Sequence, residues 1–344
     1  MLVVDLGDLS RISPSSGKLG HRVLPMNGKS NSPRKDAWLV LAMLAMIVVP
    51  AGLTLHSVRV AAVVQIPGSN PTPYGYTWSL LLFVIPTLVI AGWFLPSEGV
   101  RIPQRSFWRT IWILVPIGFG LDFFFAHRFF VYPNSGATLG IGAPAIGGSV
   151  PVEEYIFYFT GFLTVLLIYI WLDEYWMAAY AVPGYVDEAR QIRRLLQFHP
   201  ASLFVGIALI ALAILYKKLR SPVPEGFPGY FTVLTIGGLV PSISFFPVVR
   251  RFINWRAFGM TLFILLLISM FWEATLAVPY GWWGYQQKQM IGLSIGAWSG
   301  LPIEAVLVWL SVSYAAVIVY EIVKLWQASG KRARRAFFGE PTAD

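Results

Sequence analysis

The sequence predicts an all-α integral membrane protein with about eight transmembrane helices in two parallel internal repeats. Composition is the first observation, because 56% of the 344 residues are hydrophobic and only 12% are charged, against roughly 25% charged residues in soluble domains. Long apolar runs are the second, since about 20 such residues cross the hydrocarbon layer. The third is an acidic motif that occurs twice, 151 residues apart.

Eight apolar runs are the predicted spans. They lie at residues 37–56, 75–95, 108–130, 152–172, 201–216, 229–249, 257–278 and 302–323. The fifth is short and Pro241 interrupts the sixth, so these two fit the pattern least well. Residues 1–36 are rich in Ser, Gly, Pro and basic residues, as is typical of a mobile tail. This tail is too long for a secretory signal, so we expect 37–56 to be a retained helix.

The positions of Lys and Arg predict the orientation. Basic residues concentrate in the two tails and in the connections around residues 101–109, 190–194 and 250–256. The other connections hold mostly single charges, with the exception of residues 217–220, Lys-Lys-Leu-Arg. By the positive-inside rule, we expect a multi-pass protein of the cell inner membrane with both termini in the cytoplasm. Topology thus explains the net charge of +9, and no nucleic-acid partner is expected.

The repeat divides the chain into four parts. We expect a basic cytoplasmic tail at 1–36, a first membrane repeat with an extra N-terminal helix at 37–181, a second membrane repeat at 182–326 and a basic cytoplasmic tail at 327–344. With four spans in each half, the offset covers an even number of helices. The repeats are therefore predicted to be parallel and not inverted.

The motif Pro-Val-Glu-Glu at 151–154 opens the fourth predicted span, and Pro-Ile-Glu-Ala at 302–305 opens the eighth. Proline suits the first turn of a helix, and acids there benefit from the helix dipole. Asp122 and Glu273, in the outward halves of the third and seventh spans, each precede the motif's proline by 29 residues. Because a carboxylate inside a membrane is costly and by default a functional candidate, one group of acids is predicted to be catalytic. These are Glu153, Glu154, Glu304, Asp122 and Glu273.

Other acids have a plainer interpretation. Glu321 and the pair Asp173-Glu174 lie near the opposite ends of their spans, and they are expected to be interfacial. The Gly-rich connections 134–150 and 286–301 are expected to cap the site or dip into it, because irregular backbone at membrane depth must be buried in protein or line a cavity.

Aromatic residues crowd around the acids in sequence. Many could face lipid or form an interface belt, but aromatic faces also stabilise cations. Tyr132 falls on Trp283 at the repeat offset. The predicted substrate-binding residues are Phe157, Tyr158, Tyr132, Trp283 and Trp298.

These residue types permit proton transfer in an apolar cavity. Burial favours the protonated form of a carboxyl group, and a second acid nearby favours it further, so one acid can donate a proton while another accepts one. The chain has no cysteine, and its four histidines lie far apart. Neither a metal nor a cofactor is expected.

The repeated motif resembles that of the membrane lycopene (carotenoid) cyclases of bacteria, archaea and fungi, in which Pro-x-Glu-Glu opens a helix in each repeat. The resemblance covers roughly residues 75–325, in the fused two-repeat form. In the first repeat it rests on Asp122, Tyr132-Pro133, Gly140, the motif at 151–154 and Phe157. In the second it rests on Glu273, Trp283, Pro302-Ile303-Glu304 and the aromatic and aliphatic run that follows, while Gly292 is one residue out of register with Gly140.

This resemblance implies an intramolecular lyase or isomerase that closes the acyclic ends of lycopene or a related carotenoid. Glu153 and Glu154, with Glu304, would carry the proton chemistry, and the fuller first motif would hold the main proton donor. The partners would be a hydrophobic carotenoid and the lipid bilayer, with association with other carotenoid enzymes left open. Ala305 departs from the family's second acid, which leaves open an altered substrate, a single working site or another terpenoid reaction such as hydration.

Two other function classes fit the same residues. A proton-coupled transporter also uses repeats and intramembrane carboxylates, but it favours acids along a path to both faces, and the acids singled out here are expected at one depth. A non-catalytic subunit or carotenoid-binding scaffold is the third alternative, which Ala305 alone suggests.

Overall fold

Seven helices among the described residues are long and apolar enough to cross a membrane. The computed structural model describes residues 72–100, 102–182 and 185–339, together with Trp38, Leu41, Ala42, Ala45 and Val49. The seven helices span Gly75–Ser97, Gln104–Phe129, Val152–Trp176, Pro200–Leu219, Gly229–Val249, Trp255–Ala277 and Glu304–Ser329. Each coincides with a predicted span, so the chain is a multi-pass, all-α membrane protein. The first predicted span, 37–56, lies outside the described residues apart from isolated positions.

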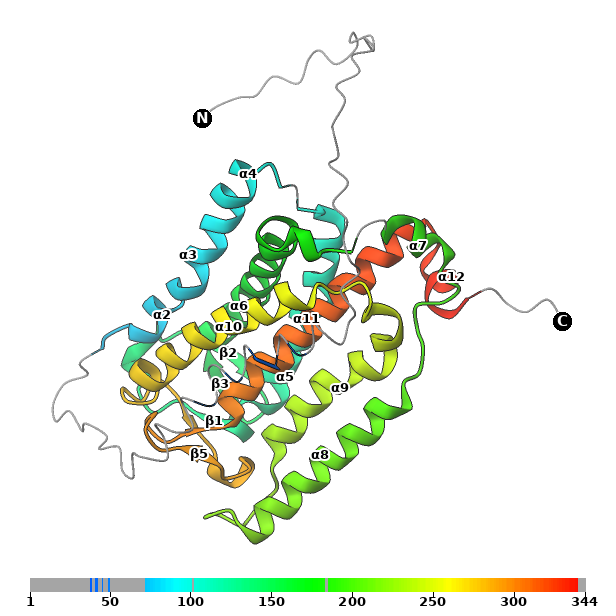
Figure 1. The fold of residues 1–344 in the computed structure, drawn as a ribbon. Coiled ribbons are helices and arrows are strands. Elements are labelled where there is room, and N and C mark those ends of the chain that lie inside the picture. Colours follow the sequence, from blue (N-terminus) through cyan, green and yellow to red (C-terminus); the bar gives the residue numbers. More distant parts are fainter. Residues whose placement is uncertain are drawn as a thin grey trace, which may run out of the picture. The chain divides into compact units, whose positions relative to one another are not determined.

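The elements follow one another as a series of long helices joined by short strands and turns (Figure 1). The first half contains α2 (Gly75–Ser79), α3 (Leu81–Val89), η1 (Ile90–Phe94), α4 (Leu95–Ser97), α5 (Gln104–Phe129), β1 (Phe130–Val131), η2 (Ser135–Ala137), β2 (Gly142–Ala145), β3 (Gly148–Pro151), α6 (Val152–Trp171), η3 (Leu172–Trp176) and η4 (Ala178–Tyr180). The second contains α7 (Tyr185–Gln191), α8 (Pro200–Leu219), α9 (Gly229–Val249), α10 (Trp255–Trp272), η5 (Glu273–Ala277), β4 (Gly284–Tyr285), η6 (Gln287–Gln289), β5 (Ser294–Ile295), β6 (Leu301–Pro302), α11 (Glu304–Ser329) and α12 (Ala333–Phe338).

The two least regular predicted spans are both continuous helices. α8 extends beyond the short apolar run, and α9 continues through Pro241 and Pro247. Membrane helices tolerate such prolines where neighbouring groups satisfy the freed carbonyls. The His199 amide donates one such bond to the carbonyl of Ile243 in α9, which Pro247 leaves free, at 2.8 Å.

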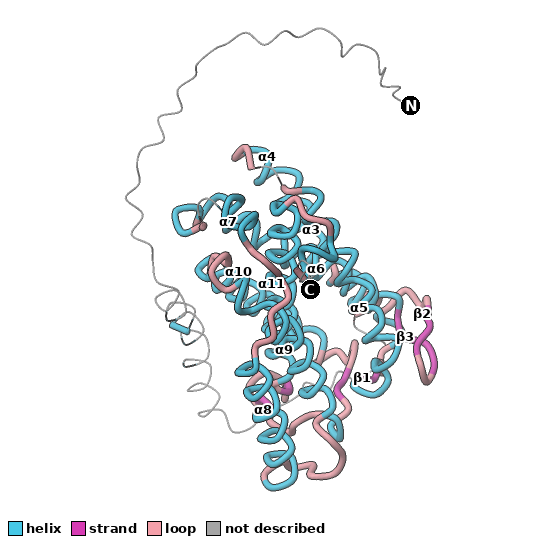
Figure 2. The backbone as a smooth tube through the Cα atoms, turned by 90° about the vertical axis from the view of Figure 1, so that its right-hand side faces the viewer, coloured by secondary structure: helices cyan, strands magenta, loops and turns pink. Residues whose placement is uncertain are grey.

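The helices alternate in direction, so their connections gather at two ends (Figures 1 and 2). The short strands lie at one end, here called the strand end. They form three antiparallel pairs: β1 with β4, β2 with β3 and β5 with β6. The opposite end carries α4, α7 and α12 (Figure 1) and is here called the basic end, because most Lys and Arg side chains of the described residues belong to its connections.

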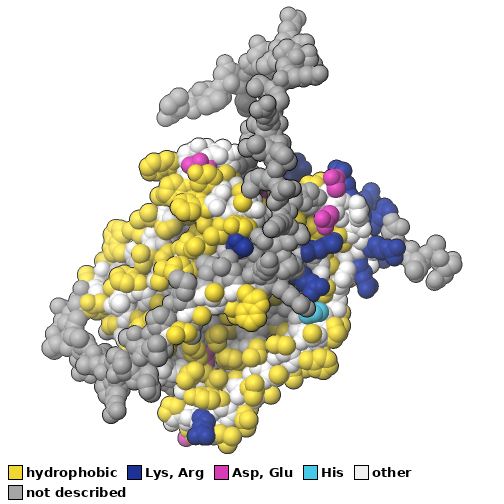
Figure 3. Space-filling model, viewed as in Figure 1, with side chains coloured by type: hydrophobic (Ala, Val, Ile, Leu, Met, Phe, Trp, Pro, Cys, Tyr) yellow, Lys and Arg dark blue, Asp and Glu magenta, His cyan; other side chains and the backbone are white. Residues whose placement is uncertain are grey.

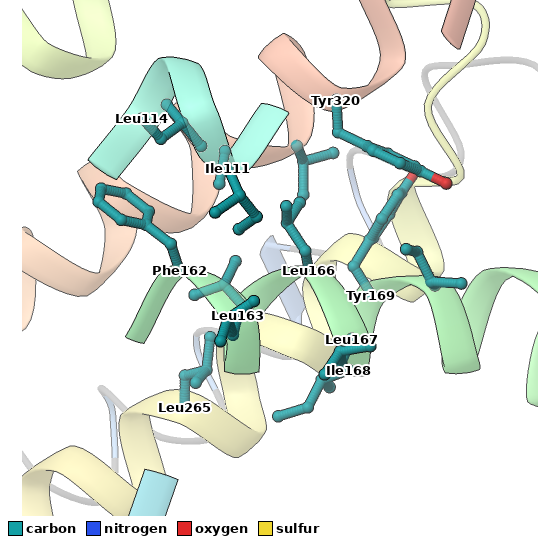
Figure 4. Packing of buried hydrophobic residues seen from close by; sticks show 14 of the residues in the cluster. Ile111, Leu114, Phe162, Leu163, Leu166, Leu167, Ile168, Tyr169, Leu265 and Tyr320 are labelled. Carbon is teal, nitrogen blue, oxygen red and sulfur yellow. The ribbon is translucent and has the colours of Figure 1, made fainter. Parts of the chain in front are cut away.

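Helix α6 lies at the centre of the packing, and α8 and α9 lie at its periphery. In the most apolar stretch of each helix, 67% of α6 residues are buried, compared with 17% in α8 and in α9. Leu166 and Leu167 of α6 pack in one cluster with Ile111 of α5 and Leu265 of α10 (Figure 4). The helix that carries the doubled glutamates is therefore the one most enclosed by protein.

Two lysines at the strand end have a structural role. Lys217 Nζ donates to the Gln287 carbonyl at 2.9 Å, and Lys218 Nζ donates to the carbonyls of Pro224 and Gly226 at 3.1 Å each. These bonds fix the connections around the end of α8. They give a physical reason for the basic residues that form the exception to the charge pattern.

The acids near the basic end do not face headgroups as expected. Glu321 is 1% exposed and Asp173 is 6% exposed. Lys324 Nζ lies 3.1 Å from Glu321 Oε1 and 3.9 Å from Asp173 Oδ2, and the Tyr169 hydroxyl also donates to Glu321 at 3.2 Å. The expectation was wrong for these two acids, because a lysine one helical turn after Glu321 compensates their charge inside the protein. Glu174 is exposed.

Candidate functional site

In each acidic motif, a short strand leads directly into a helix. β3 ends at Pro151, which pairs with Gly142 of β2, and α6 begins at the next residue. β6 likewise ends at Pro302, which pairs with Ser294 of β5, and α11 begins at Glu304. In both motifs the acids therefore lie in the first helical turn, as the proline predicted.

Glu153 and Glu304 bind the connections that precede them. Glu153 Oε1 accepts hydrogen bonds from the Leu139 amide at 2.7 Å and from Thr77 Oγ1 at 2.5 Å, and Glu304 Oε1 accepts one from the Ile291 amide at 2.5 Å. Each amide donor immediately precedes a glycine with positive φ, Gly140 at 73° and Gly292 at 88°. The two glutamates thus hold equivalent loops. The amide donor lies 14 residues before Glu153 but 13 before Glu304, which accounts for the shifted glycine.

Glu154 and Glu273 share one small cavity. It has a volume of about 50 Å³, and eight of the eleven residues that line it are aromatic. Glu154 comes from the first turn of α6, and Glu273 begins η5, a π-helical turn that continues α10. Single π-helical turns often occur at functional sites, because they re-aim a side chain out of the regular helix.

Tyrosine hydroxyls hold both carboxylates. The Tyr76 hydroxyl donates to Glu154 Oε1 at 2.7 Å, and the Tyr132 hydroxyl also interacts with Glu154. Glu273 accepts hydrogen bonds from Ser269 Oγ at 3.0 Å and from the Tyr285 hydroxyl. Such donors fix the direction in which each carboxyl group faces the cavity.

Tyr132 and Tyr285 lie outside the membrane-spanning helices. Burial raises the pKa of Tyr132, and the nearby Glu154 and Asp122 raise it further. Burial and Glu273 raise the pKa of Tyr285 in the same way. Both phenols therefore stay neutral and can donate their protons in hydrogen bonds at any physiological pH.

Asp122 lies behind the cavity wall. It is 2% exposed and interacts with the hydroxyl of Tyr158 and with the carboxylate of Glu154. Tyr158 lines the cavity and Asp122 does not. Asp122 therefore acts on the cavity through its interactions with the Tyr158 hydroxyl and with Glu154.

The aromatic lining is continuous. The ring centroid of Trp272 is 4.7 Å from that of Trp283 and 5.3 Å from that of Phe157, and the centroid of Tyr76 is 4.9 Å from that of Trp283. A second hollow of about 20 Å³ adjoins the first, shares Phe157, Tyr158 and Val308 with it and lies between α6 and α11. The site thus has an apolar extension along the contact between these helices.

The structure brings together most of the predicted site residues and separates a few. Glu154, Glu273, Phe157, Tyr158 and Trp283 line the cavity, and Asp122 and Tyr132 adjoin Glu154. Glu153 and Glu304 face the loops instead. Trp298 packs beside Met270, Leu301 and Ala305 and does not line the cavity.

Sequence reasoning missed several lining residues, chiefly Tyr76, Tyr230 and Tyr285. One signal for the first two is visible in the sequence, since a Gly-Tyr pair opens both α2 and α9. Within the described residues, no group of three or more His, Asp or Glu side chains lies together as a metal site would require.

Comparisons of the chain with protein-family models, with curated proteins and with solved structures gave no match.

Proposed function

We propose that the protein is a carotenoid (lycopene-type) cyclase that closes acyclic end groups by acid-base catalysis without net redox change. The observation that carries the proposal is that Glu154 and Glu273, from two different helices, line one cavity whose other walls are almost entirely aromatic. This is the combination that protonation of a hydrocarbon needs: a proton donor, a proton acceptor and faces that stabilise a cation.

The proposed reaction has three steps. Glu154 donates its proton to a terminal carbon–carbon double bond, which leaves a tertiary carbocation on the end group. A second double bond of the same chain attacks the cation and closes the ring. A carboxylate, either Glu273 or Glu154 itself, then removes a proton beside the new cation, so the product is an isomer of the substrate.

The aromatic rings act while the charge is on carbon. Each face within about 6 Å of a cation contributes about 0.5–2 kcal/mol. Trp272, Trp283 and Phe157 form contiguous walls, so they can stabilise the cation at successive positions along the end group. Their bulk also excludes water, which would otherwise capture the cation and give a hydrated product.

Substrate entry requires side chains to move. A cavity of about 50 Å³ is far below the roughly 300 Å³ of typical ligand pockets. Phe157, Tyr158 and Val308 separate it from the adjoining hollow between α6 and α11. Rotation of these side chains would join the two spaces into a slot that receives the end of a linear hydrocarbon.

We propose a single composite site made by two parallel repeats. The first repeat supplies Glu154, and the second supplies Glu273 from the helix before its motif. Ala305, the counterpart of Glu154, is 1% exposed and packs among apolar residues. The matching bonds from Leu139 to Glu153 and from Ile291 to Glu304 support the repeats.

We also propose that the basic end faces the cytoplasm of an inner-membrane protein.

The arrangement of acids favours a cyclase over a proton-coupled transporter. A proton relay in a transporter is a chain of Asp, Glu or His side chains between the two faces. Glu154 and Tyr169 are 15 residues apart on α6, about 22 Å along a helix. Between them lie buried apolar side chains such as Phe162, Leu163 and Leu166 (Figure 4), and the acids beyond are paired with Lys324.

Expression of the chain in a lycopene-accumulating host tests the proposal. We expect cyclic carotenoids, separated by chromatography and identified by their absorption spectra, in the wild type, and lycopene alone with Glu154→Gln. An epitope tag measures the amount of each protein in the membrane fraction. Recovery of lycopene alone from well-expressed wild-type protein would contradict the cyclase proposal.

A further inference from the structure

A hollow at the basic end is lined by four cationic side chains. It has a volume of about 660 Å³, and none of the eight residues that line it is acidic. Its cations are Arg193, Arg194, Lys331 and Arg335. In the space-filling view, Lys and Arg side chains gather over the region of α7 and α12 (Figure 3).

The two walls of this basic hollow are tied together by backbone hydrogen bonds. One wall is the connection between α7 and α8, and the other is the end of α11 with α12. The Leu195 amide donates to the Ala336 carbonyl at 2.9 Å, and the Leu196 amide donates to the Phe337 carbonyl at 3.1 Å. Lys331 Nζ adds a bond to the Ile192 carbonyl at 2.7 Å. These hydrogen bonds fix the shape of the hollow, and they hold its cations close together despite their mutual repulsion.

The acids of the neighbouring elements have other partners. Asp187 pairs with Arg190 at 3.4 Å and Glu188 pairs with Arg251 at 3.7 Å. Deeper in the bundle, Lys324 compensates Glu321. Among the described acids of these elements, none is left to compensate Arg193 and Arg194, so the charge of these two arginines is suited to an anion from outside the chain.

We propose that the basic hollow binds the phosphate group of an anionic lipid headgroup. Arginine side chains present paired N–H donors that match phosphate oxygens, and basic pockets beside membrane helices bind lipid headgroups of this kind. The hollow lies where α11 ends, at the depth of the headgroups, and Phe338 on its rim is 69% exposed. That position favours a lipid over a soluble phosphate compound. None of the residues that line the basic hollow belongs to the candidate site.

Lipid retention by the purified full-length protein tests the site. The protein is taken from detergent micelles that contain equal amounts of phosphatidylglycerol and phosphatidylcholine, and bound lipid is counted by native mass spectrometry. The wild type should retain phosphatidylglycerol preferentially. The double variant Arg193→Gln/Arg194→Gln should retain about ten-fold less phosphatidylglycerol than the wild type, because charge-assisted hydrogen bonds to phosphate are stronger than neutral ones.

Arg332→Gln/Arg334→Gln is the matched control. It removes the same charge from exposed positions of the same end that do not line the hollow, and it should retain the lipid as the wild type does. Equal loss of bound phosphatidylglycerol in both double variants would contradict the proposed site, as would a wild type with no preference for phosphatidylglycerol. Displacement of the lipid by an equal concentration of inorganic phosphate would overturn its assignment to a lipid. Arg335→Gln, on the opposite wall, repeats the test if the double variant does not accumulate.

Discussion

The two adjacent glutamates of the first motif face different surroundings. Successive residues of a helix point about 100° apart, so Glu153 and Glu154 cannot both face the same space. Glu153 turns to the loop and binds the Leu139 amide, whereas Glu154 turns to the aromatic cavity and binds the Tyr76 hydroxyl. The acidic doublet therefore combines a residue that positions the loop with a residue that lines the cavity.

This division predicts unequal effects of two isosteric substitutions. Glu154→Gln removes the proposed proton donor and is expected to lower ring formation by about 10²-fold or more, the usual contribution of a general acid. Glu153→Gln keeps an oxygen that accepts the Leu139 bond, but it puts N–H donors where Glu153 Oε2 is buried without a partner. It should therefore chiefly lower stability, by about 1–3 kcal/mol. Carotenoid yield per tagged protein and thermal unfolding in detergent measure the two effects. If Glu153→Gln alone abolished cyclisation in a stable protein, the assigned roles would be reversed.

Tyr285 offers a second residue-scale prediction. Tyr285→Phe removes the hydroxyl that donates to Glu273 and leaves a buried carboxylate oxygen without a partner, which costs about 1–3 kcal/mol. Because burial and Glu273 raise the pKa of Tyr285, its contribution is complete below the ordinary tyrosine pKa of about 10 and is lost only as the pH rises through the higher folded value. The melting-temperature difference from wild type should thus persist up to at least about pH 9. A difference that vanished by pH 8 would contradict this account.

At the scale of elements, the contact between α5 and α6 sets the position of the cavity wall. A Cβ atom added at Gly118 of α5 would lie 2.7 Å from a ring carbon of Tyr158 and 3.0 Å from one of Phe162. Tyr158 lines the cavity and interacts with Asp122. Glycine at this position therefore lets α5 approach α6 closely enough to bring Asp122 behind Tyr158.

Gly118→Ala tests this contact, and Gly120→Ala is its control. Both substitutions add one methyl group to the same helix, but at Gly120 the added atom would meet nothing within 4 Å. We expect Gly118→Ala to destabilise the protein by about 1–3 kcal/mol, as overpacking does, and to lower the carotenoid yield. Gly120→Ala should be neutral or stabilising by up to about 1 kcal/mol. Equal behaviour of the two variants would refute the importance of the close contact.

The sequence was sufficient to place the seven membrane-spanning helices among the described residues, and the reason is physical. A span must contain about 20 apolar residues and satisfy its backbone internally, so hydropathy alone located α5, α9 and α11. Proline followed by an acid marked the first turns of α6 and α11. The π-helical turn at Glu273 could not be predicted, because it arises from packing against other helices.

At the scale of the whole molecule, most of the site comes from contacts between distant segments. The hydrogen bond between Tyr76 and Glu154 joins residues 78 positions apart, and the strand pair of Phe130 with Tyr285 joins the two halves of the chain. The repeat offset identified the acids Asp122 and Glu273, because carboxylates are rare in membranes. It could not identify Tyr76 or Tyr230, because tyrosine is common at membrane interfaces and gives no comparable signal.

The molecule also carries a second buried polar cluster at the opposite end of its central helices. The rings of Tyr169 and Tyr320, 151 residues apart in sequence, meet with centroids 6.2 Å apart, and Tyr169 donates to Glu321. Lys324 lies beside Glu321 and Asp173. This charged cluster joins α6 to α11 at the basic end, as the aromatic cavity joins them at the strand end.

Removal of its lysine should therefore destabilise the whole bundle. Lys324→Met leaves two buried acids without their counter-charge and is expected to cost about 3–5 kcal/mol, as breaking a buried ion pair does. Adding Glu321→Gln should recover part of this loss, because one of the uncompensated charges disappears. Arg251→Gln is the control, since its pair with Glu188 is about half exposed and is worth at most about 1 kcal/mol. Thermal unfolding in detergent would rank the variants, and a Lys324→Met protein as stable as Arg251→Gln would show that the cluster does not hold the two helices together.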